Sequence, residues 1–309
     1  MRLLPVFLRV PLAALLIVAS ILVHVVPLFA IALLKAVLPF ERVRVACNPL
    51  LTGIAESWIG FNGILIGWFA RTRFAVAEQA ALRRDGHYLV LANHQSWVDI
   101  FVLQKLSNRR IPLLRFFRTR ELVWIPLMGL AWWALDFPFM RRYTHGQLKR
   151  RPELAGRDIE TTRRACAKFR AIPVSIMNFV EGTRFTAAKH AAQSSPYRHL
   201  LKPKSGGVAF VIDAMGDGLQ SILDVTLIYP AGIPTMVDLF AGRVPEVRVD
   251  VRERPIPREF GGGGYQTEAA TRARFHQWMN ALWSEKDATC ARLLAAGNPL
   301  EDETREHRG

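Results

Sequence analysis

Cysteine is scarce in this sequence, and the three residues present are Cys47, Cys166 and Cys290. Their number is odd, they lie far apart and no CxxC pair occurs, so neither a disulfide framework nor a zinc site is indicated. The eight histidines show no spacing typical of metal ligands. We therefore expect no metal site, and a reducing compartment for the globular part of the chain.

Charged side chains are absent from residues 10–34, a run of 25 positions without Asp, Glu, Lys or Arg. As a helix the run would reach roughly 37 Å, enough to cross a hydrocarbon core of about 30 Å. A cleaved signal peptide fits less well, because its apolar region usually has only about 7–15 residues. Pro27 is compatible either with a kink in one spanning helix or with the turn of a hairpin. We predict a membrane anchor over residues 1–45, as a helix or a helical hairpin.

A second apolar stretch covers residues 57–70 and is rich in tryptophan, phenylalanine and isoleucine. Its 14 residues are short for a membrane span. The length therefore favours a helix that is buried in the core or that lies in the membrane interface.

Acidic residues are outnumbered, with 26 Asp and Glu against 41 Lys and Arg. The excess is concentrated in residues 105–170, where 16 basic residues accompany five acidic ones. A solvated basic face would explain the excess, and so would an anionic partner: a membrane surface, a phosphorylated substrate or nucleic acid. Beside a membrane anchor, a phospholipid surface is favoured. Residues 109–120 mix arginine with large apolar side chains, as expected of a segment in the headgroup layer or of an amphipathic surface helix.

The region after the anchor alternates strands and helices, which predicts an α/β fold. Strands are expected at residues 87–92, 172–180, 223–228 and 247–252, the last one half exposed because apolar and polar residues alternate. Helices are expected at 96–106, 153–170 and 266–295, and a long polar loop at 186–204. We predict a single catalytic domain over residues 46–296, with a central mixed sheet flanked by helices, and a disordered tail at 297–309.

The first candidate site is the segment Asn93–Asp99, where a predicted strand gives way to a helix. Ligands bind at such strand ends in open α/β sheets. A turn there can fold His94 back over Asp99, and a histidine held by a carboxylate is a good general base. Ser96 and Asp99 also spell a helix-capping box, which would only start the helix.

The second candidate site is the stretch Glu181-Gly182-Thr183-Arg184, which also leaves the end of a buried strand. Gly182 permits a tight turn, and Thr183 can donate to an anion. Arg184 offers a planar fork of donors suited to phosphate. An ordinary loop with an ion pair between Glu181 and Arg184 is the alternative interpretation.

Together these two segments resemble the lysophosphatidic acid acyltransferase family, which carries an H-x4-D signature. Asn93-His94 with Asp99 is similar to the first motif of that family, and Glu181–Arg184 is similar to its third. Phe139–Arg142 resembles the second motif, although Asp136 stands where that motif usually begins with glycine. Residues 225–230, an apolar strand that ends in proline, resemble the fourth. The stretch around residues 178–185 and the final helix look closest to a bacterial inner-membrane subgroup.

The resemblance implies an O-acyltransferase that moves a fatty acyl group from acyl-CoA or acyl carrier protein to a lysophospholipid hydroxyl. His94 would be the general base, oriented by Asp99. The substrate-binding residues would be Asn93, Glu181, Gly182, Thr183, Arg184 and Arg142.

The resemblance further implies no cofactor beyond the thioester co-substrate and no metal. It places the protein in the cell inner membrane, among membrane phospholipids, with the catalytic domain on the cytoplasmic side. Lysophosphatidic acid is the expected acceptor, with a lyso-ornithine lipid or lysophosphatidylglycerol as alternatives. A membrane-tethered nucleic-acid-binding protein is a further alternative, but no nucleic-acid-binding motif is present, so we expect no nucleic acid partner.

Overall fold

The computed structural model describes residues 4–38, 40–116, 118–119, 134–135, 139–140, 172–215, 218–261, 265 and 268–296. The helix predicted at 153–170, the residue Arg142 and the tail predicted at 297–309 lie outside these ranges. Two short paired strands, β4 (Arg118–Thr119) and β5 (Phe139–Met140), are described at backbone level.

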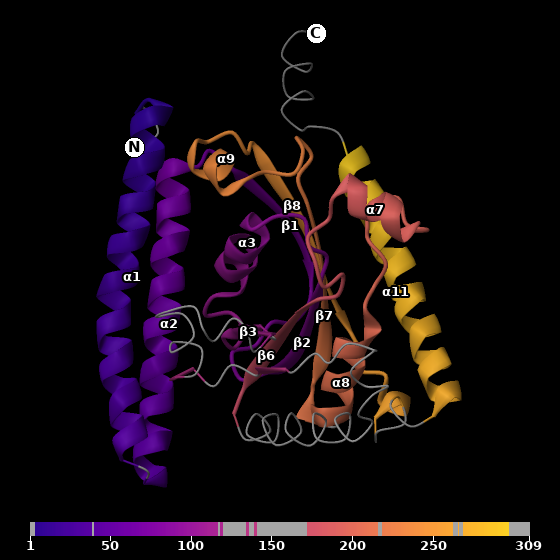
Figure 1. Cartoon of the computed structure of the whole chain (residues 1–309), viewed down its shortest axis with the longest axis horizontal. Helices are drawn as coiled ribbons and strands as arrows, with labels where there is room; N and C mark the ends of the chain where they lie inside the picture. Colours follow the sequence, from indigo (N-terminus) through magenta and orange to yellow (C-terminus); the bar gives the residue numbers. More distant parts are fainter. Residues whose placement is uncertain are drawn as a thin grey trace.

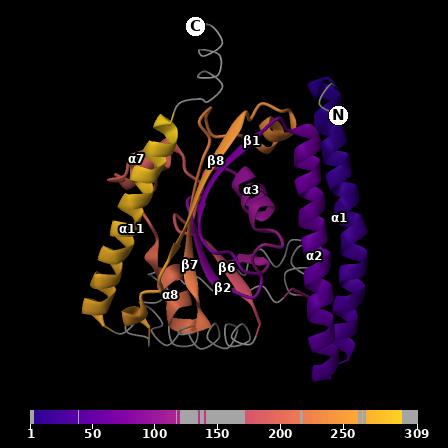
Figure 2. The ribbon, with the colours of Figure 1, turned by 180° about the vertical axis from the view of Figure 1, so that it is seen from behind.

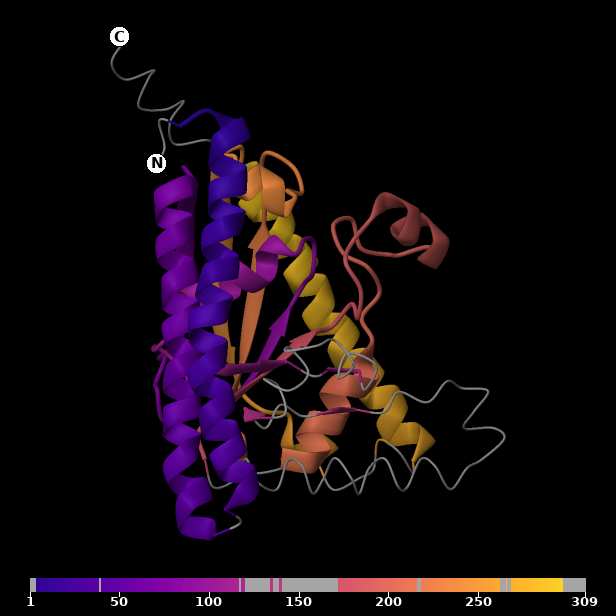
Figure 3. The ribbon, with the colours of Figure 1, turned by 60° about the vertical axis from the view of Figure 1, so that its left-hand side comes forward.

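Two long helices begin the chain and lie side by side along one flank of the domain (Figures 1 and 3). Helix α1 (Val6–Val37) continues through Pro27, and the chain reverses before α2 (Glu41–Phe69). A hairpin that turns at Pro27 is therefore wrong. The apolar stretch at 57–70 is not a separate short helix, because it forms the second half of α2. The boundary predicted after residue 45 accordingly falls inside α2.

Both helices are long and apolar enough to cross a membrane by length and composition, within the part of the chain that the structure describes. Large apolar side chains cover the outer side of α1, including Val18, Leu22, Val23 and Val26. The inner side of the hairpin is attached to the domain by polar contacts. Arg9 donates from Nη1 to the Ala241 carbonyl at 2.9 Å. Glu56 of α2 pairs with Arg84 at 3.1 Å, so both helices are held against the domain.

The predicted mixed sheet is present, with six strands in the order β1-β8-β7-β2-β6-β3. These strands are β1 (Arg73–Gln79), β2 (His87–Ala92), β3 (Leu114–Phe116), β6 (Val174–Phe179), β7 (Ser221–Ile228) and β8 (Glu246–Arg254). Strands β7, β2, β6 and β3 run parallel, whereas β8 runs antiparallel to β7 and parallel to β1. The strands predicted at 87–92, 172–180 and 223–228 are thus confirmed, and they form the centre of the sheet.

Helices cover both faces of the sheet (Figure 2). One side carries α3 (Val98–Ser107) and α9 (Met236–Phe240), backed by the hairpin. The other side carries α8 (Ser205–Met215), the short helix η4 (Arg258–Phe260) and the last helix α11 (Ala269–Ala295). Neighbouring residues of β2 serve opposite cores, Val90 the first and Leu91 the second, as strand alternation requires.

Strand β8 was predicted to be half exposed, and this is wrong. Arg248 and Asp250, on its polar side, are 6% and 2% exposed. Their charges are paired inside the structure: Arg248 with Glu246 at 2.9 Å, and Asp250 with Arg292 of α11 at 2.8 Å. The last helix brings the matching charge to this face, so an alternating strand is buried on both sides.

Two other segments differ from expectation. Within residues 109–120, Leu114–Phe116 form the edge strand β3 and Arg115 is 7% exposed, so this part is neither a surface helix nor a headgroup-layer segment. The predicted loop at 186–204 contains a short helix, α7 (Ala187–Gln193), capped by Thr186. Figure 3 shows α7 standing out from the body of the domain.

Candidate active site

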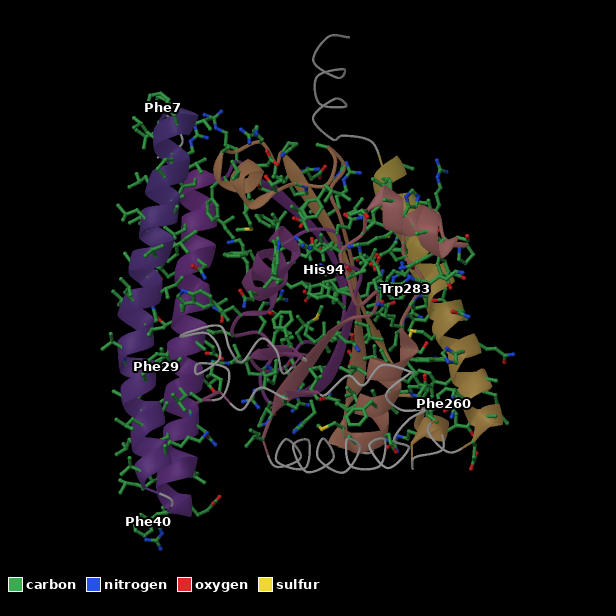
Figure 4. The ribbon with its side chains drawn as sticks, in the orientation of Figure 1. Phe7, Phe29, Phe40, His94, Phe260 and Trp283 are labelled. Carbon is green, nitrogen blue, oxygen red and sulfur yellow. The ribbon has the colours of Figure 1, made fainter. Side chains whose placement is uncertain are left out.

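The candidate site lies at the edge of the sheet where β2 and β6 end in register and where β7 continues to Ile228. Register pairs Ala92, the last residue of β2, with Phe179 of β6 and with Val225 of β7. The residues just beyond these ends therefore meet at one edge of the sheet. They bring together His94 after β2, Glu181 after β6 and Tyr229 after β7. In the view of Figure 4, His94 is seen between α3 and the strands of the sheet.

His94 and Asp99 are in direct contact, as the first motif predicted. Nδ1 of His94 lies 2.9 Å from Oδ2 of Asp99, which is fully buried in the first turn of α3. The same oxygen accepts hydrogen bonds from the backbone N–H groups of Gln95 at 2.6 Å and Ser96 at 2.9 Å. The capping interpretation is thus also correct in part, because one carboxylate both starts the helix and holds the histidine.

The orientation of the His94 ring leaves its other nitrogen available. An ionised carboxylate can only accept, so Nδ1 of His94 carries a hydrogen, and in the neutral ring Nε2 is then the nitrogen with the lone pair. The ring stacks on Phe179 with centroids 3.8 Å apart and planes 12° apart, and its side chain is 13% exposed. No described residue bonds to Nε2. This is the geometry required of a general base.

Tyr229 completes the surroundings of Asp99, and the sequence interpretation gave it no role. Its phenol donates to Oδ1 of Asp99 at 2.6 Å. Burial, followed by the nearby carboxylate, raises the pKa of Tyr229, so the phenol remains a donor. A polar residue directly after a predicted buried strand, at the edge where the motifs converge, was the signal that could have revealed it.

Asn93 is buried, and its amide is bonded to the backbone of the neighbouring strand. Nδ2 donates to the Leu227 carbonyl at 2.8 Å, and Oδ1 accepts from the Leu227 N–H at 2.9 Å. These two bonds continue the β2–β7 pairing beyond Ala92, where backbone pairing stops. The side chain therefore fixes the position from which His94 emerges.

Glu181 supports His94 from the backbone. Its Oε1 accepts from the His94 N–H at 2.8 Å, and its Oε2 accepts from the Leu201 N–H at 3.0 Å. The side chain is fully buried, and burial raises the pKa of Glu181 to about 7 despite these two hydrogen bonds. Because both oxygens are engaged, the predicted alternative of a simple ion pair with Arg184 is not formed.

The remaining residues of the stretch turn outwards. Gly182 has φ +66°, a conformation that favours glycine. Thr183 accepts a hydrogen bond from Nζ of Lys189 at 2.8 Å. Arg184 is exposed, and its guanidinium lies 4.7 Å from the ring centroid of Trp97, in cation–π contact. The third motif thus presents Arg184 to solvent beside the first motif.

The last helix supports the site from behind, which the sequence interpretation did not foresee. Nε1 of Trp283 donates to the Leu201 carbonyl at 2.9 Å, and Leu201 in turn donates to Glu181. Lys286 is 1% exposed, donates to the Val225 carbonyl at 2.7 Å and pairs with Asp224. A line of contacts therefore runs from α11 through Leu201 and Glu181 to the backbone of His94.

The two described cysteines do not offer a nucleophile. Cys47 and Cys290 are buried, and burial raises the pKa of Cys290 to about 12, so this thiol stays protonated near neutral pH. Among the residues that the structure describes, no group of three His, Cys, Asp or Glu side chains could hold a metal ion.

The chain is similar in sequence and in fold to known proteins. A family model described as Acyltransferase matches residues 73–233, slightly more than half of the chain, and this range includes both motif segments and Tyr229. A human protein named 1-acyl-sn-glycerol-3-phosphate acyltransferase gamma is 25% identical over 245 residues, which cover 73% of this chain and 59% of that protein. A Saccharomyces cerevisiae protein named 2-acyl-1-lysophosphatidylinositol acyltransferase is 22% identical, with 71% and 64% covered.

The chain spans about three fifths of the length of these curated relatives. Among solved structures, the 1-acyl-sn-glycerophosphate acyltransferase PlsC from Thermotoga maritima matches with a TM-score of 0.54 and 17% identity. That match covers 95% of this chain and 99% of the other, so the two proteins share a fold. With the family model spanning the whole site, the chain belongs to the Acyltransferase family.

Proposed function

We propose that this protein transfers a fatty acyl group from an acyl thioester to the free hydroxyl of a lysophospholipid, with lysophosphatidic acid as the acceptor and phosphatidic acid as the product. The observation that carries the proposal is the bond between Nδ1 of His94 and Asp99, with Nε2 left open at the edge of the sheet. The family match and the names of the relatives support the reaction type.

The proposed chemistry needs one base and one activated carbonyl. Nε2 of His94 takes the proton of the acceptor hydroxyl while its oxygen attacks the thioester carbonyl, and Asp99 stabilises the imidazolium that forms. Collapse of the tetrahedral intermediate breaks the carbon–sulfur bond, and His94 returns the proton to the departing thiolate. No acyl-enzyme forms, and the thioester of acyl-CoA or acyl carrier protein supplies the activation, so neither a metal nor a cofactor is needed.

The roles of the other residues follow from their positions. Arg184 is exposed beside the His94–Asp99 pair and would bind the anionic headgroup of the acceptor. Glu181 and Gly182 shape the loop that presents Arg184 and Thr183, whereas Asn93 positions His94 through Leu227. A role for Arg142 in acceptor binding stays a prediction.

The hairpin of α1 and α2 would bring this site to its lipid substrate. Its outer face is apolar and its inner face is docked on the domain through Arg9 and Glu56, so we propose membrane anchoring in the cell inner membrane with the domain on the cytoplasmic side, where thioester donors are found. Replacing Leu22, Val23 and Val26 by serine should release the protein from membranes during alkaline carbonate extraction. Retention of that variant in the pellet would contradict anchoring through this face.

The reaction is tested with membranes that contain the wild type or His94→Ala, supplied with radiolabelled oleoyl-CoA and lysophosphatidic acid. We expect phosphatidic acid from the wild type, and a loss of roughly 10²–10⁴-fold in rate for the variant. If a labelled product forms only from another lysolipid in a mixed pool, the proposed reaction stands and the proposed acceptor is wrong. Acyl transfer that does not depend on His94, with acyl carrier protein also tried as donor, would refute the mechanism.

A further inference from the structure

The segment between Glu181 and Asp213 carries basic side chains and no acidic one. Its five basic residues are Arg184, Lys189, Arg198, Lys202 and Lys204. It includes the stretch at 186–204 that the sequence marked as a long polar segment, and it lies between the third motif and helix α8. The proposed chemistry uses only Arg184 from this set, which leaves the other four without a role.

Lys204 lies directly over Gly182. A Cβ atom added to Gly182 would meet Cδ of Lys204 at 2.9 Å and its Nζ at 3.3 Å. The backbone fixes this contact, because the Lys204 N–H donates to the Val180 carbonyl at 2.8 Å. Because Gly182 has no side chain, the aliphatic part of Lys204 can pack against the backbone of the third motif. Lys204 is exposed, and no described acidic side chain pairs with its ammonium group.

Two further cations border the same stretch. Lys189 donates to the Thr183 hydroxyl at 2.8 Å and to the Arg184 carbonyl at 3.0 Å, which are neutral acceptors that leave its charge uncompensated. Arg184 lies on Trp97, which is also neutral. Three like charges around residues 182–184 repel each other, and an anion bound among them would relieve this repulsion.

Helix α8 adds donors at the same place. It begins at Ser205, immediately after Lys204, and the first N–H groups of a helix have no partner within it. The positive end of the helix dipole also attracts anions. The Ser205 side chain is 3% exposed, and its hydroxyl finds no hydrogen-bond partner among the described residues. An anion bound at the first turn of α8 would offer this hydroxyl an acceptor.

We propose that Lys204, together with Arg184, Lys189 and the N-terminus of α8, binds the phosphomonoester of the acceptor and selects it over a phosphodiester. The inference rests on the proposed function and defines its substrate class. A phosphomonoester carries a charge of about −1.5 to −2 near neutral pH, whereas a diester carries one charge. Arg184 alone balances a single charge, and Lys204 supplies the balance for the second.

The test compares two acceptors that differ by one methyl group and one charge: lysophosphatidic acid and its phosphomethyl diester. The full-length wild type, Lys204→Gln and Lys204→Arg are assayed in membranes for KM and kcat on both acceptors and on oleoyl-CoA. Lys202→Gln is the matched control, because Lys202 is an exposed lysine two positions earlier. We expect Lys204→Gln to raise KM for lysophosphatidic acid roughly 10- to 100-fold, with little change for the diester or the donor.

Lys204→Arg and Lys202→Gln should stay within about threefold of the wild type, since the first keeps the charge and no described contact joins the Lys202 side chain to residues 182–184. Equal losses of Lys204→Gln on both acceptors, or a rise only in the KM for oleoyl-CoA, would overturn the inference while leaving the acyl transfer intact. If the wild type acylates neither acceptor, the proposed function fails instead. Should Lys204→Gln not accumulate, an unchanged acceptor preference in Lys189→Gln, assayed in the same way, overturns the shared anion site.

Discussion

Tyr229 and Asp99 are joined by a hydrogen bond of 2.6 Å from the phenol to Oδ1, on the side of the carboxylate that His94 does not use. Replacing Tyr229 with Phe leaves this buried oxygen without its donor, so Asp99 and the ring it orients lose a constraint. We expect kcat to fall roughly 10-fold with KM nearly unchanged, since a buried unsatisfied group costs about 1–3 kcal/mol. Tyr88→Phe is the control, because Tyr88 is an equally buried phenol at the other end of β2. Equal kcat values in the two variants would exclude this role.

Glu181 gives the protein a pH-dependent stability. Burial raises its pKa in the folded state to about 7, from an ordinary value of 4.5. The unfolded chain therefore loses this proton first as pH rises, and folding stability falls between about pH 4.5 and 7. The fall amounts to roughly 3 kcal/mol, at 1.36 kcal/mol per pKa unit.

Glu181→Gln removes the ionisation, so its stability should lack this component. Unfolding of the solubilised wild type and variant, measured at pH 5, 6, 7 and 8, gives the difference in free energy of unfolding. Between pH 5 and 7 the free energy of unfolding of the wild type should fall relative to that of the variant. Above pH 7 the difference should stay constant. A difference that is constant across the four pH values would mean that Glu181 does not titrate in this range.

Arg184 is held over Trp97 without a carboxylate partner among the described residues, which leaves its donors free for an anion. Arg184→Ala should raise the KM for the acceptor roughly 10- to 100-fold and change the KM for acyl-CoA much less. Trp97→Ala should have a smaller effect, about two- to fivefold, because cation–π contacts at exposed sites are worth about 0.5–1 kcal/mol. Arg198→Ala controls for general loss of positive charge. A loss confined to the donor would reassign Arg184 to thioester binding.

Trp283 links the last helix to the site through the Leu201 carbonyl. Trp283→Phe keeps an aromatic ring but removes the donor and leaves a cavity, so we expect a loss of about 2–4 kcal/mol in unfolding free energy. Trp278→Phe, on the same helix but only partly buried, should cost much less. Thermal unfolding of both variants measures the difference, and similar midpoints would remove the proposed support.

The sequence predicted the site correctly where the residues involved lie close together in the chain, directly after a predicted strand. The apolar runs at 87–92 and 172–180 predicted two central strands, and the polar residues after the first run predicted the contact between His94 and Asp99. The contact of Glu181 with the backbone of His94 was not predicted. Partners from distant parts of the chain were not predictable in this way. Trp283 is 82 residues from Leu201, and its helical pattern looks the same whether it packs on apolar side chains or bonds to a loop carbonyl.

The wrong prediction for β8 and the open choice at Pro27 have the same physical origin. Alternation in β8 predicted a solvent-facing side, but Arg292 neutralises Asp250 from another helix, and no local pattern reports such a partner. Pro27 left a continuous helix and a hairpin turn both open, and α1 continues to Val37, because proline in a long apolar helix is tolerated when neighbouring segments support it. In both cases tertiary contacts outweighed the local signal.

The pairing of β1 with β8 has a consequence for the order of synthesis. Strand β1 ends at Gln79 and its only partner in the described sheet begins at Glu246. At about 5–20 residues per second, a ribosome needs roughly 10–30 s to make the intervening chain. During this interval the hairpin of α1 and α2 is already complete and can insert into a bilayer. Strand β1, which follows it in the chain, has unpaired backbone N–H and C=O groups until β8 is made. Strand β1 can therefore join the sheet only after β8 has been made, and its open edge exposes the nascent chain to aggregation until then.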